Sequence, residues 1–397
     1  MDAQPRAVPG VRLGTAAAGI RYPGRDDLVI VELPAGASTA AVFTRNRFRA
    51  APVRLAEAHL DATPPRYLLV NSGCANAGTG AQGETDALAC CRALAARAGC
   101  APEEVLPFST GVIGESLPVA RIEAALDAAL GDRSETGWSR AAVGIHTTDT
   151  RSKIASTVVQ VGETGWVVTG MAKGAGMIRP DMATMLAYVA TDAGLTPELA
   201  DRVLRDAVGT SFNRVTVDGD TSTNDAAVLV ASGTGATVTE GSEALTALSS
   251  AVEAVCVSLA QQIAADGEGA TRLVEVCVEG ARSVPEAEGV AFTVAESPLV
   301  KTALAAADPN WGRILAAVGR AGIDDLDIAG VDIRIGEVPI VCSGQRADDY
   351  DEARATGVLE GERVPIHIGL SRGEAAATVW TCDLTAEYVR INAEYRT

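Results

Sequence analysis

The sequence has few of the features that nucleic-acid-binding and membrane proteins depend on. It holds 33 lysines and arginines against 51 aspartates and glutamates, which gives a formal net charge of −18. A surface field of that sign repels phosphate backbones and anionic membranes. The start, Met1–Arg6, lacks the apolar stretch of a signal peptide, and no later segment approaches the roughly 20 apolar residues of a membrane span. We therefore expect a cytoplasmic protein that binds neither nucleic acid nor membrane.

Histidine is also scarce, and the cysteines lack the spacing of a metal site. The three histidines, His59, His146 and His367, lie far apart, and the eight cysteines show no Cys-x-x-Cys spacing. Cysteines scattered among apolar neighbours are typical of buried free thiols rather than of zinc sites or disulfides. The acidic loop Asp218–Asp225 lacks the spacing and the glutamate of a calcium-binding loop. We expect no metal site in this chain.

The apolar residues predict a large core in an α/β fold. Hydrophobic residues make up 47% of the 397 positions but aromatics only 4%, so that core must rest on aliphatic side chains. Strand-like runs at Leu28–Val31, Tyr67–Val70 and Ser156–Val159 alternate with helical stretches at Glu84–Ala98 and Ser242–Ala264. This alternation favours a layered α/β sandwich without internal linkers.

The loop after Lys173 carries the most chemical information in the chain. Gly165–Gly170 favours a strand, Ala172–Pro180 a turn rich in glycine and proline, and Thr184–Thr191 a buried strand. We therefore expect Thr184 to begin a strand whose remainder is fixed in the core. A reactive group at that position would be held in place, as catalysis requires.

The Ala183–Thr184 junction combines a small residue with a hydroxyl residue. Taken alone, it is an ordinary start of a strand. A cut between the two residues, however, would make Thr184 an amino terminus, whose free α-amine can accept the hydroxyl proton directly or through a water. Such a nucleophile needs no histidine, which fits the scarcity of that residue.

Sequence blocks along essentially the whole chain resemble one family. In chain order they are Asn71–Gly73, Ser109–Gly114, Thr147–Thr150, Lys173–Tyr188, Ser211–Arg214, Val217–Asp225, Asp266–Thr271, Ser297–Thr302, Asp308–Arg313 and Ile391–Tyr395. Together they resemble the ornithine acetyltransferase family, also called the bifunctional glutamate N-acetyltransferases or ArgJ family. Its members are self-cleaving N-terminal-nucleophile enzymes with a layered α/β sandwich.

The resemblance implies self-cleavage between Ala183 and Thr184. The products would be an α chain of residues 1–183 and a β chain of residues 184–397 that fold together rather than as independent domains. Thr184 would be the nucleophile. The Thr110 hydroxyl and the Gly111 backbone N–H would form an oxyanion hole that serves both peptide cleavage and acetyl transfer.

Five further residues match the family's substrate-binding positions and are expected to act together with Thr184. They are Thr150, Lys173, Glu268, Asn392 and Thr397. The resemblance implies that Glu268 binds an ammonium group of the substrate. Lys173 would pair with a substrate carboxylate or lower the pKa of the Thr184 amine by like charge. Asn392 and Thr397 would fold back over the site from the end of the chain.

The implied reaction moves an acetyl group from N2-acetyl-ornithine to glutamate through an acetyl-Thr184 ester, as part of arginine biosynthesis. The substrates would be small molecules and no cofactor is needed, although some family members also use acetyl-CoA as a co-substrate. The implied assembly is a heterotetramer of two α and two β chains.

Three alternatives stay open at this point. The chain could be a family member from a specialised-metabolite pathway that acts on a related amino acid. It could be an amidohydrolase or aminopeptidase with the same type of nucleophile, in which water resolves the acyl-enzyme. It could also be an uncleaved metabolite-binding protein, although the complete block around Thr184 argues against this.

Overall fold

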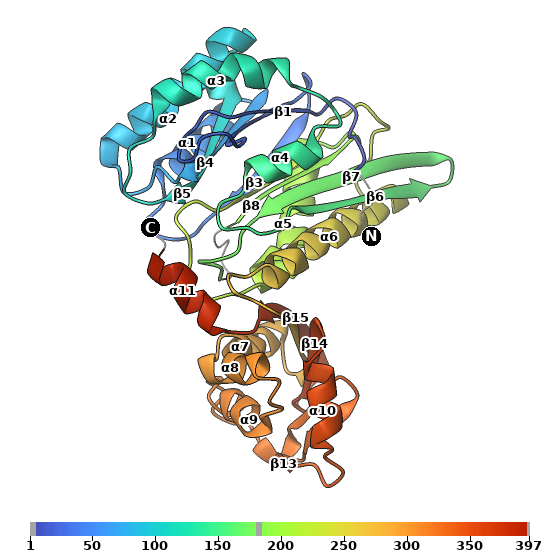
Figure 1. The fold of residues 1–397 in the computed structure, drawn as a ribbon. Helices are drawn as coiled ribbons and strands as arrows, with labels where there is room; N and C mark the ends of the chain where they lie inside the picture. Colours follow the sequence, from blue (N-terminus) through green and yellow to red (C-terminus); the bar gives the residue numbers. More distant parts are fainter. Residues whose placement is uncertain (1–4, 180–184, 395–397) are drawn as a thin grey trace.

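The computed structural model describes residues 5–179 and 185–394, which form a layered sandwich and a smaller lobe (Figure 1). The sandwich stacks helices, a four-stranded sheet, a five-stranded sheet and helices again. The expected layered α/β sandwich is thus confirmed. No boundary was predicted for the separate lobe beneath it.

The first sheet has the strand order β1-β2-β4-β5. These strands are β1 (Arg12–Ala16), β2 (Leu28–Glu32), β4 (Tyr67–Cys74) and β5 (Val105–Val112). Helices α2 (Gly80–Ala98) and α3 (Val119–Gly131) cover its outer face, while α1 (Ala51–Ala62) packs beside β5 and α4 (Trp138–Gly144) contributes to the core between the sheets. In β2, Leu28 and Ile30 face the outer helices and Val29 and Val31 face the second sheet. Because both faces are buried, the run is apolar throughout rather than alternating.

The second sheet has the order β3-β9-β8-β7-β6. Its strands are β3 (Ser38–Phe43), β6 (Lys153–Val161), β7 (Thr164–Lys173), β8 (Leu186–Thr191) and β9 (Ala226–Ala231), and its outer helices are α5 (Pro197–Thr210) and α6 (Glu243–Ala265). The two sheets meet in an aliphatic core in which the rings of Phe108 and Tyr188 pack edge to face at 5.4 Å. This contact ties β5 to β8, which are the strands nearest the predicted chemistry.

The second sheet is built from both sides of the predicted cleavage junction. Strands β3, β6 and β7 precede it, whereas β8 and β9 follow it. Lys173 of β7 pairs with Leu186 of β8, and Phe43 of β3 pairs with Ala226 of β9. Neither half of the chain therefore contains this sheet alone.

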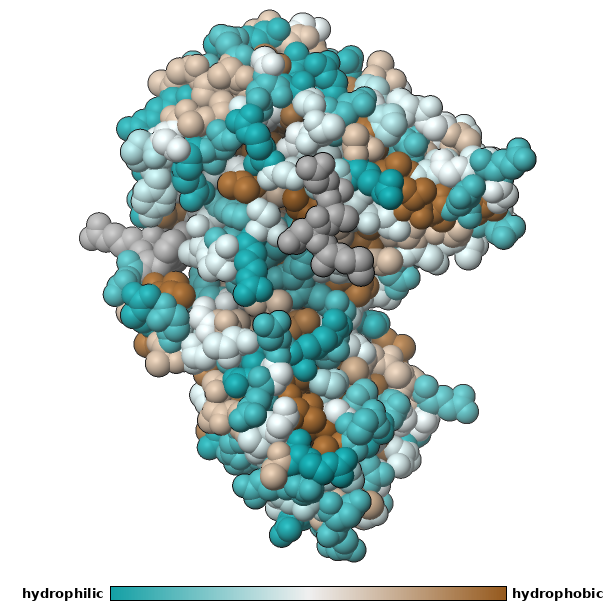
Figure 2. All heavy atoms as spheres, turned by 45° about the vertical axis from the view of Figure 1, so that its right-hand side comes forward, coloured by the Kyte–Doolittle hydropathy of each residue, from teal (hydrophilic) through white to brown (hydrophobic). Residues whose placement is uncertain are grey.

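The smaller lobe has its own six-stranded sheet and apolar core. Its elements are β10 (Leu273–Ala281), β11 (Asp332–Ile335), β12 (Val338–Cys342), β13 (Gln345–Arg346), β14 (Arg363–Gly369), β15 (Ala375–Cys382), α7 (Val284–Ala295), α8 (Pro298–Ala305), α9 (Trp311–Gly319) and α10 (Glu352–Leu359). One short 3-10 turn lies in this lobe at Ile328–Gly330, and two lie in the sandwich at Pro102–Glu104 and Phe212–Arg214. From this lobe, α11 (Ala386–Glu394) leads back towards the sandwich and lies between the two lobes (Figure 1). On the face drawn in Figure 2, apolar residues are scattered among polar ones over both lobes.

Helix α6 corrects one expectation from the sequence. By length and composition alone this helix could cross a membrane, whereas the sequence analysis expected no segment as long and apolar as a membrane span. The helix instead lies along the second sheet, where Leu248, Val255 and Leu259 are buried in the core. Its apolar composition reflects this packing, since a helix between a sheet and another helix has little exposed surface.

The remaining strand and helix predictions are confirmed, with shifted ends. Strand β7 continues to Lys173, so the expected turn at Ala172–Pro180 begins two residues late. Strand β8 is buried at all six positions and begins at Leu186. Helix α2 begins at Gly80, four residues before the predicted start at Glu84.

Candidate active site

A pocket of about 90 Å³ lies where the carboxyl ends of β5 and β7 meet five loops and helix α11. It brings together five residues predicted from the sequence, which are Thr110, Gly111, Lys173, Glu268 and Asn392. The other lining residues are Ala75, Ile113, Thr147, Thr148, Gly176, Met177, Ser222, Thr223 and Asn224. These residues come from both sides of the predicted junction and from the last helix, so only the folded chain assembles the pocket.

Lys173 and Thr110 form a direct contact at the base of the pocket. Both side chains are buried, and the Lys173 Nζ donates to the Thr110 Oγ1 at 3.0 Å. An ammonium group can only donate, so Thr110 accepts here and its own hydroxyl proton must point elsewhere. Burial lowers the pKa of Lys173, the Asp149 carboxylate opposes that shift, and the Lys153 charge adds to it.

Gly111 occupies a position that excludes any side chain. Its φ is +129°, and a Cβ there would lie 2.3 Å from the carbonyl carbon of Gly73 on β4. The register between β4 and β5 shifts at this point, so the two backbones approach closely. A glycine is therefore required at this irregular point of strand β5, where its backbone lines the pocket.

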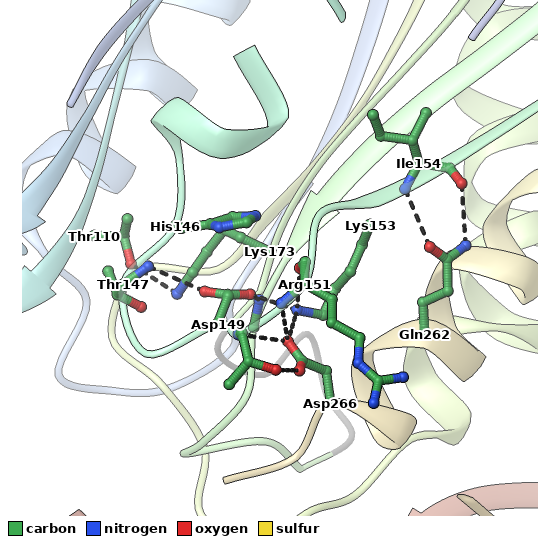
Figure 3. Close-up of polar contacts among 12 residues, drawn as sticks. Thr110, His146, Thr147, Asp149, Arg151, Lys153, Ile154, Lys173, Gln262 and Asp266 are labelled. Atoms are coloured by element: carbon green, nitrogen blue, oxygen red, sulfur yellow. Dashed lines mark hydrogen bonds and ion pairs between the residues drawn. The ribbon is translucent and has the colours of Figure 1, made fainter. Parts of the chain in front are cut away.

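A buried chain of alternating charges supports Lys173 (Figure 3). Asp149 accepts hydrogen bonds from the Lys153 Nζ and from the Gly174 backbone N–H, both at 2.7 Å. Lys153 Nζ also donates to Asp266 at 2.5 Å, and all three side chains are at most 4% exposed. Burial alone would raise the pKa of Asp149, but Lys173 and Lys153 reverse that effect and hold it well below its usual range. The network fixes the loop that follows β7 through Gly174.

Thr150 is engaged by this network rather than by the pocket. Its backbone N–H donates to Asp266 at 3.0 Å, and its hydroxyl makes a second, short hydrogen bond to the same carboxylate. The described residues that line the pocket include its neighbours Thr147 and Thr148 but not Thr150 itself. A substrate contact from Thr150 therefore stays a prediction.

Glu268 faces the pocket between a glycine loop and the last helix. Its backbone N–H donates to Ala175 O at 2.8 Å, and its Oε2 accepts from the Asn392 Nδ2 at 2.8 Å. A Cβ on Gly176 would lie 2.5 Å from the Glu268 carboxyl, so a side chain at this loop position would displace the carboxylate. The contact between Glu268 and Asn392 joins α11 to the pocket.

Three predicted residues, Ala183, Thr184 and Thr397, lie outside the described residues. The chain on both sides of the junction is nevertheless anchored. Before it, Met177 and Ile178 donate their backbone N–H groups to Asp218 at 2.7 and 2.9 Å. After it, the Met185 N–H donates to the buried carboxylate of Asp225 at 2.8 Å. The residue next to the predicted nucleophile is thus fixed to the core.

The histidines differ in their distance from this site. His59 lies in α1, where its Nδ1 is 2.8 Å from Val105 O, and His367 lies on β14 in the smaller lobe. Only His146 lies beside the charged network (Figure 3). Burial lowers the pKa of His146, while the nearby Asp149 charge opposes the shift. Within residues 5–179 and 185–394, no group of three or more His, Cys, Asp and Glu side chains could hold a metal ion.

Sequence patterns missed the network formed by Asp149, Lys153 and Asp266. Asp149 and Asp266 lie in sequence blocks that resemble the family, and their place in these blocks was the feature of the sequence that could have identified them. Asp266 lies more than a hundred residues along the chain from Asp149 and Lys153, so no local periodicity relates it to them. Their proximity follows only from the packing of α6 on β6 and β7.

Comparison with known proteins gives a consistent assignment. A model of the ArgJ family matches residues 12–397. Proteins named "Arginine biosynthesis bifunctional protein ArgJ" from Methylococcus capsulatus and Pseudomonas fluorescens are 55% and 51% identical to this chain, over 98% of its length and 96% and 97% of theirs. A crystal structure of the Bacillus halodurans protein of that name is 41% identical with a TM-score of 0.51, and covers 52% of this chain and 98% of its own. The chain belongs to the ArgJ family.

Proposed function

We propose that this protein transfers an acetyl group from N2-acetyl-ornithine to glutamate through an acetyl-Thr184 intermediate in arginine biosynthesis. One observation carries the proposal: the pocket gathers Thr110, Gly111, Lys173 and Glu268 from separate elements in a chain of the ArgJ family. Relatives that are 50–55% identical over nearly their full length are named for arginine biosynthesis.

The nucleophile arises by self-cleavage between Ala183 and Thr184. The products are an α chain of residues 1–183 and a β chain of residues 184–397, which stay together because they share the second sheet. The Bacillus halodurans structure supports this division, because 98% of that solved chain corresponds to only 52% of the present one. Anchoring of Met185 by Asp225 supports a new terminus that is held rather than frayed.

The transfer has two half-reactions. The Thr184 hydroxyl attacks the acetyl carbonyl while the α-amine takes its proton, and collapse of the tetrahedral intermediate breaks the C–N bond and releases ornithine with that proton. The α-amine of glutamate then attacks the acetyl ester, its proton passes back to the Thr184 oxygen, and N-acetylglutamate leaves.

The oxyanion that forms in each half-reaction is stabilised by Thr110 and Gly111. Lys173 supports this role, because its ammonium donates a hydrogen bond to the Thr110 oxygen. The hydroxyl proton of Thr110 is then free to be donated to the oxyanion. Such a donor stabilises a tetrahedral intermediate by about 2.7–4 kcal/mol. The same positive charge disfavours protonation of the Thr184 amine, which keeps that base neutral.

The other predicted residues bind substrate. Glu268 holds the ammonium group of ornithine, and Asn392 positions this carboxylate through their mutual hydrogen bond. Thr150 and Thr397 complete the substrate-binding set carried over from the family. Ala183 serves only as the residue before the cut.

The cycle needs no cofactor, because Thr184 itself carries the acetyl group between the two substrates. We include acetyl-CoA as a second acetyl donor for the same nucleophile. The proposed assembly is a heterotetramer of two α and two β chains in the cytoplasm, acting on small molecules.

Product analysis tests this function. Purified protein incubated with N2-acetyl-ornithine and glutamate should release ornithine and N-acetylglutamate in equal amounts, as measured by mass spectrometry. Without glutamate, release should stop after about one turnover. Continued release of acetate without glutamate would instead identify an amidohydrolase and overturn the transferase assignment.

A further inference from the structure

A second cavity adjoins the reaction pocket on the side of the four-stranded sheet. It measures about 170 Å³, and Thr147 and Thr148 line both cavities. Its far wall comes from the loop between β1 and β2, which contributes Arg21 and Arg25. A ligand in the reaction pocket therefore lies one pair of threonines away from two guanidinium groups.

Arg25 is held in place without a carboxylate partner among the described residues. Its Nη2 donates to His146 O at 2.5 Å and lies 3.5 Å from the Ser72 hydroxyl, and the residue is half-buried. Arg21 reaches Glu115 only at 3.4 Å, in an exposed pair. Other arginines, such as Arg66 and Arg313, also donate to backbone carbonyls without an ion pair among the described residues, but Arg25 does so at the wall of a cavity.

Among the described residues that line this cavity, the one acidic residue is already engaged. Both oxygens of Asp27 accept backbone hydrogen bonds at 2.6 Å, from Ala18 and from Ile20. These bonds shape the loop that presents the arginines. The guanidinium carbons of Arg21 and Arg25 lie over the Tyr22 ring, 5.7 and 6.0 Å from its centroid, so one aromatic ring contacts both cations. The cavity thus offers guanidinium donors arranged for an anion.

The proposed reaction requires such a group. Its donor and acceptor meet the same Thr184, yet the ornithine side chain ends in an ammonium group and the glutamate side chain ends in a carboxylate. The Glu268 carboxylate attracts the ornithine ammonium group and repels the glutamate carboxylate. Lys173, the cation among the described residues that line this pocket, is buried and already donates to Thr110. The glutamate side chain therefore needs a separate positive subsite.

We propose that Arg25, assisted by Arg21, forms an anion subsite that binds the side-chain carboxylate of the acceptor amino acid. The proposal rests on the acetyl transfer described above. It assigns acceptor specificity to the second cavity and donor specificity to Glu268. Arginine suits the role because its planar fork can donate two hydrogen bonds to one carboxylate.

The two half-reactions test the proposal separately in the self-cleaved enzyme. For Arg25→Met we expect kcat/KM for glutamate to fall roughly 10- to 100-fold, the effect of losing a charged hydrogen bond. The rate of ornithine release from N2-acetyl-ornithine should change less than threefold. Glutamine as acceptor provides the decisive readout, because the preference for glutamate over glutamine should collapse in the variant.

Two variants control for structural damage. Arg25→Lys keeps the charge and should recover part of the preference for glutamate. Arg97→Met removes a cation that pairs with Asp127 on the outer helices, and it should leave the preference unchanged. A preference for glutamate over glutamine that survives in Arg25→Met would overturn the proposal.

Other binding modes give different results. If Arg25 held the α-carboxylate shared by both substrates, KM for N2-acetyl-ornithine would rise as much as KM for glutamate. If it held phosphates, only KM for acetyl-CoA would rise. Either outcome overturns the subsite. A wild-type enzyme that fails to acetylate glutamate would instead contradict the proposed function itself.

Discussion

At the scale of single residues, Thr110 has two separable duties. It accepts a hydrogen bond from the buried Lys173, and we propose that it donates one to the developing oxyanion. Thr110→Val removes both at nearly constant volume, so kcat should fall by about 10²–10³. Thr110→Ser keeps the hydroxyl and should stay within about tenfold of the wild type. Steady-state kinetics with a thermal melt of each variant would check this, and an active Val variant would exclude Thr110 from the oxyanion hole.

The general base is the second residue-scale question. An unperturbed α-amine has a pKa of about 7.7–8.0, so transfer should decline in mild acid as the Thr184 amine gains a proton. His146 is the rival, because it lies beside the network and burial lowers its pKa. We expect kcat/KM against pH to keep its acid limb in His59→Gln, His146→Gln and His367→Gln. Loss of that limb in any one of the three would assign the base to that histidine.

At the scale of elements, the charged network ties β6, the end of α6 and the loop after β7 together. Lys173 and Lys153 hold the pKa of Asp149 below its usual range, so the folded protein takes up this proton less readily than the unfolded chain. The stabilisation by Asp149 is therefore complete above about pH 4, the unfolded value, and is lost as the pH falls further.

Asp149→Asn tests this linkage. At neutral pH the variant should be less stable by about 3–5 kcal/mol, because two buried lysines lose a partner. The gap between the melting temperatures of wild type and variant should narrow as the pH drops below about 4. Asp201→Asn, which breaks an exposed pair with Arg205 on α5, should change stability by less than about 1 kcal/mol. A gap that is constant with pH would contradict the assigned role of Asp149.

The sequence predicted elements whose pattern is local. The apolar runs at Leu28–Val31 and Tyr67–Val70 lie in strands, and Ser242 caps helix α6 by accepting from the Leu245 N–H. The ends of elements depend on tertiary pairing, and for this reason β7 extends to Lys173, where it still pairs with β8. Site residues in recognisable blocks could be named, whereas the contact between Asp149 and Lys153 and its link to Asp266 required the packed structure.

At the scale of the whole molecule, the two proposed chains share one sheet. Strand β9 of the second half lies between β3 of the first half and β8, so each half alone would expose open sheet edges and much of the core. The boundary of the smaller lobe could not be predicted, because its strands and helices continue the same α/β pattern without a linker.

This sharing predicts that the halves fold only together. Residues 1–183 and 184–397 expressed separately should be insoluble or should lack the melting transition of the sandwich, whereas co-expression should yield one complex that shows this transition. Size-exclusion chromatography and calorimetry would measure both. Two independently folded halves would contradict the shared sheet as the basis of assembly.

Formation of the Thr184 nucleophile and its acetylation can be read directly from the intact mass of the protein. The wild type should consist of two chains divided between Ala183 and Thr184, and N2-acetyl-ornithine without glutamate should add the mass of one acetyl group to the chain of residues 184–397. Thr184→Ser should still divide, while Thr184→Ala should remain one unmodified chain. An undivided wild type, an acetyl group on residues 1–183, or a divided Thr184→Ala chain would contradict Thr184 as the self-generated nucleophile.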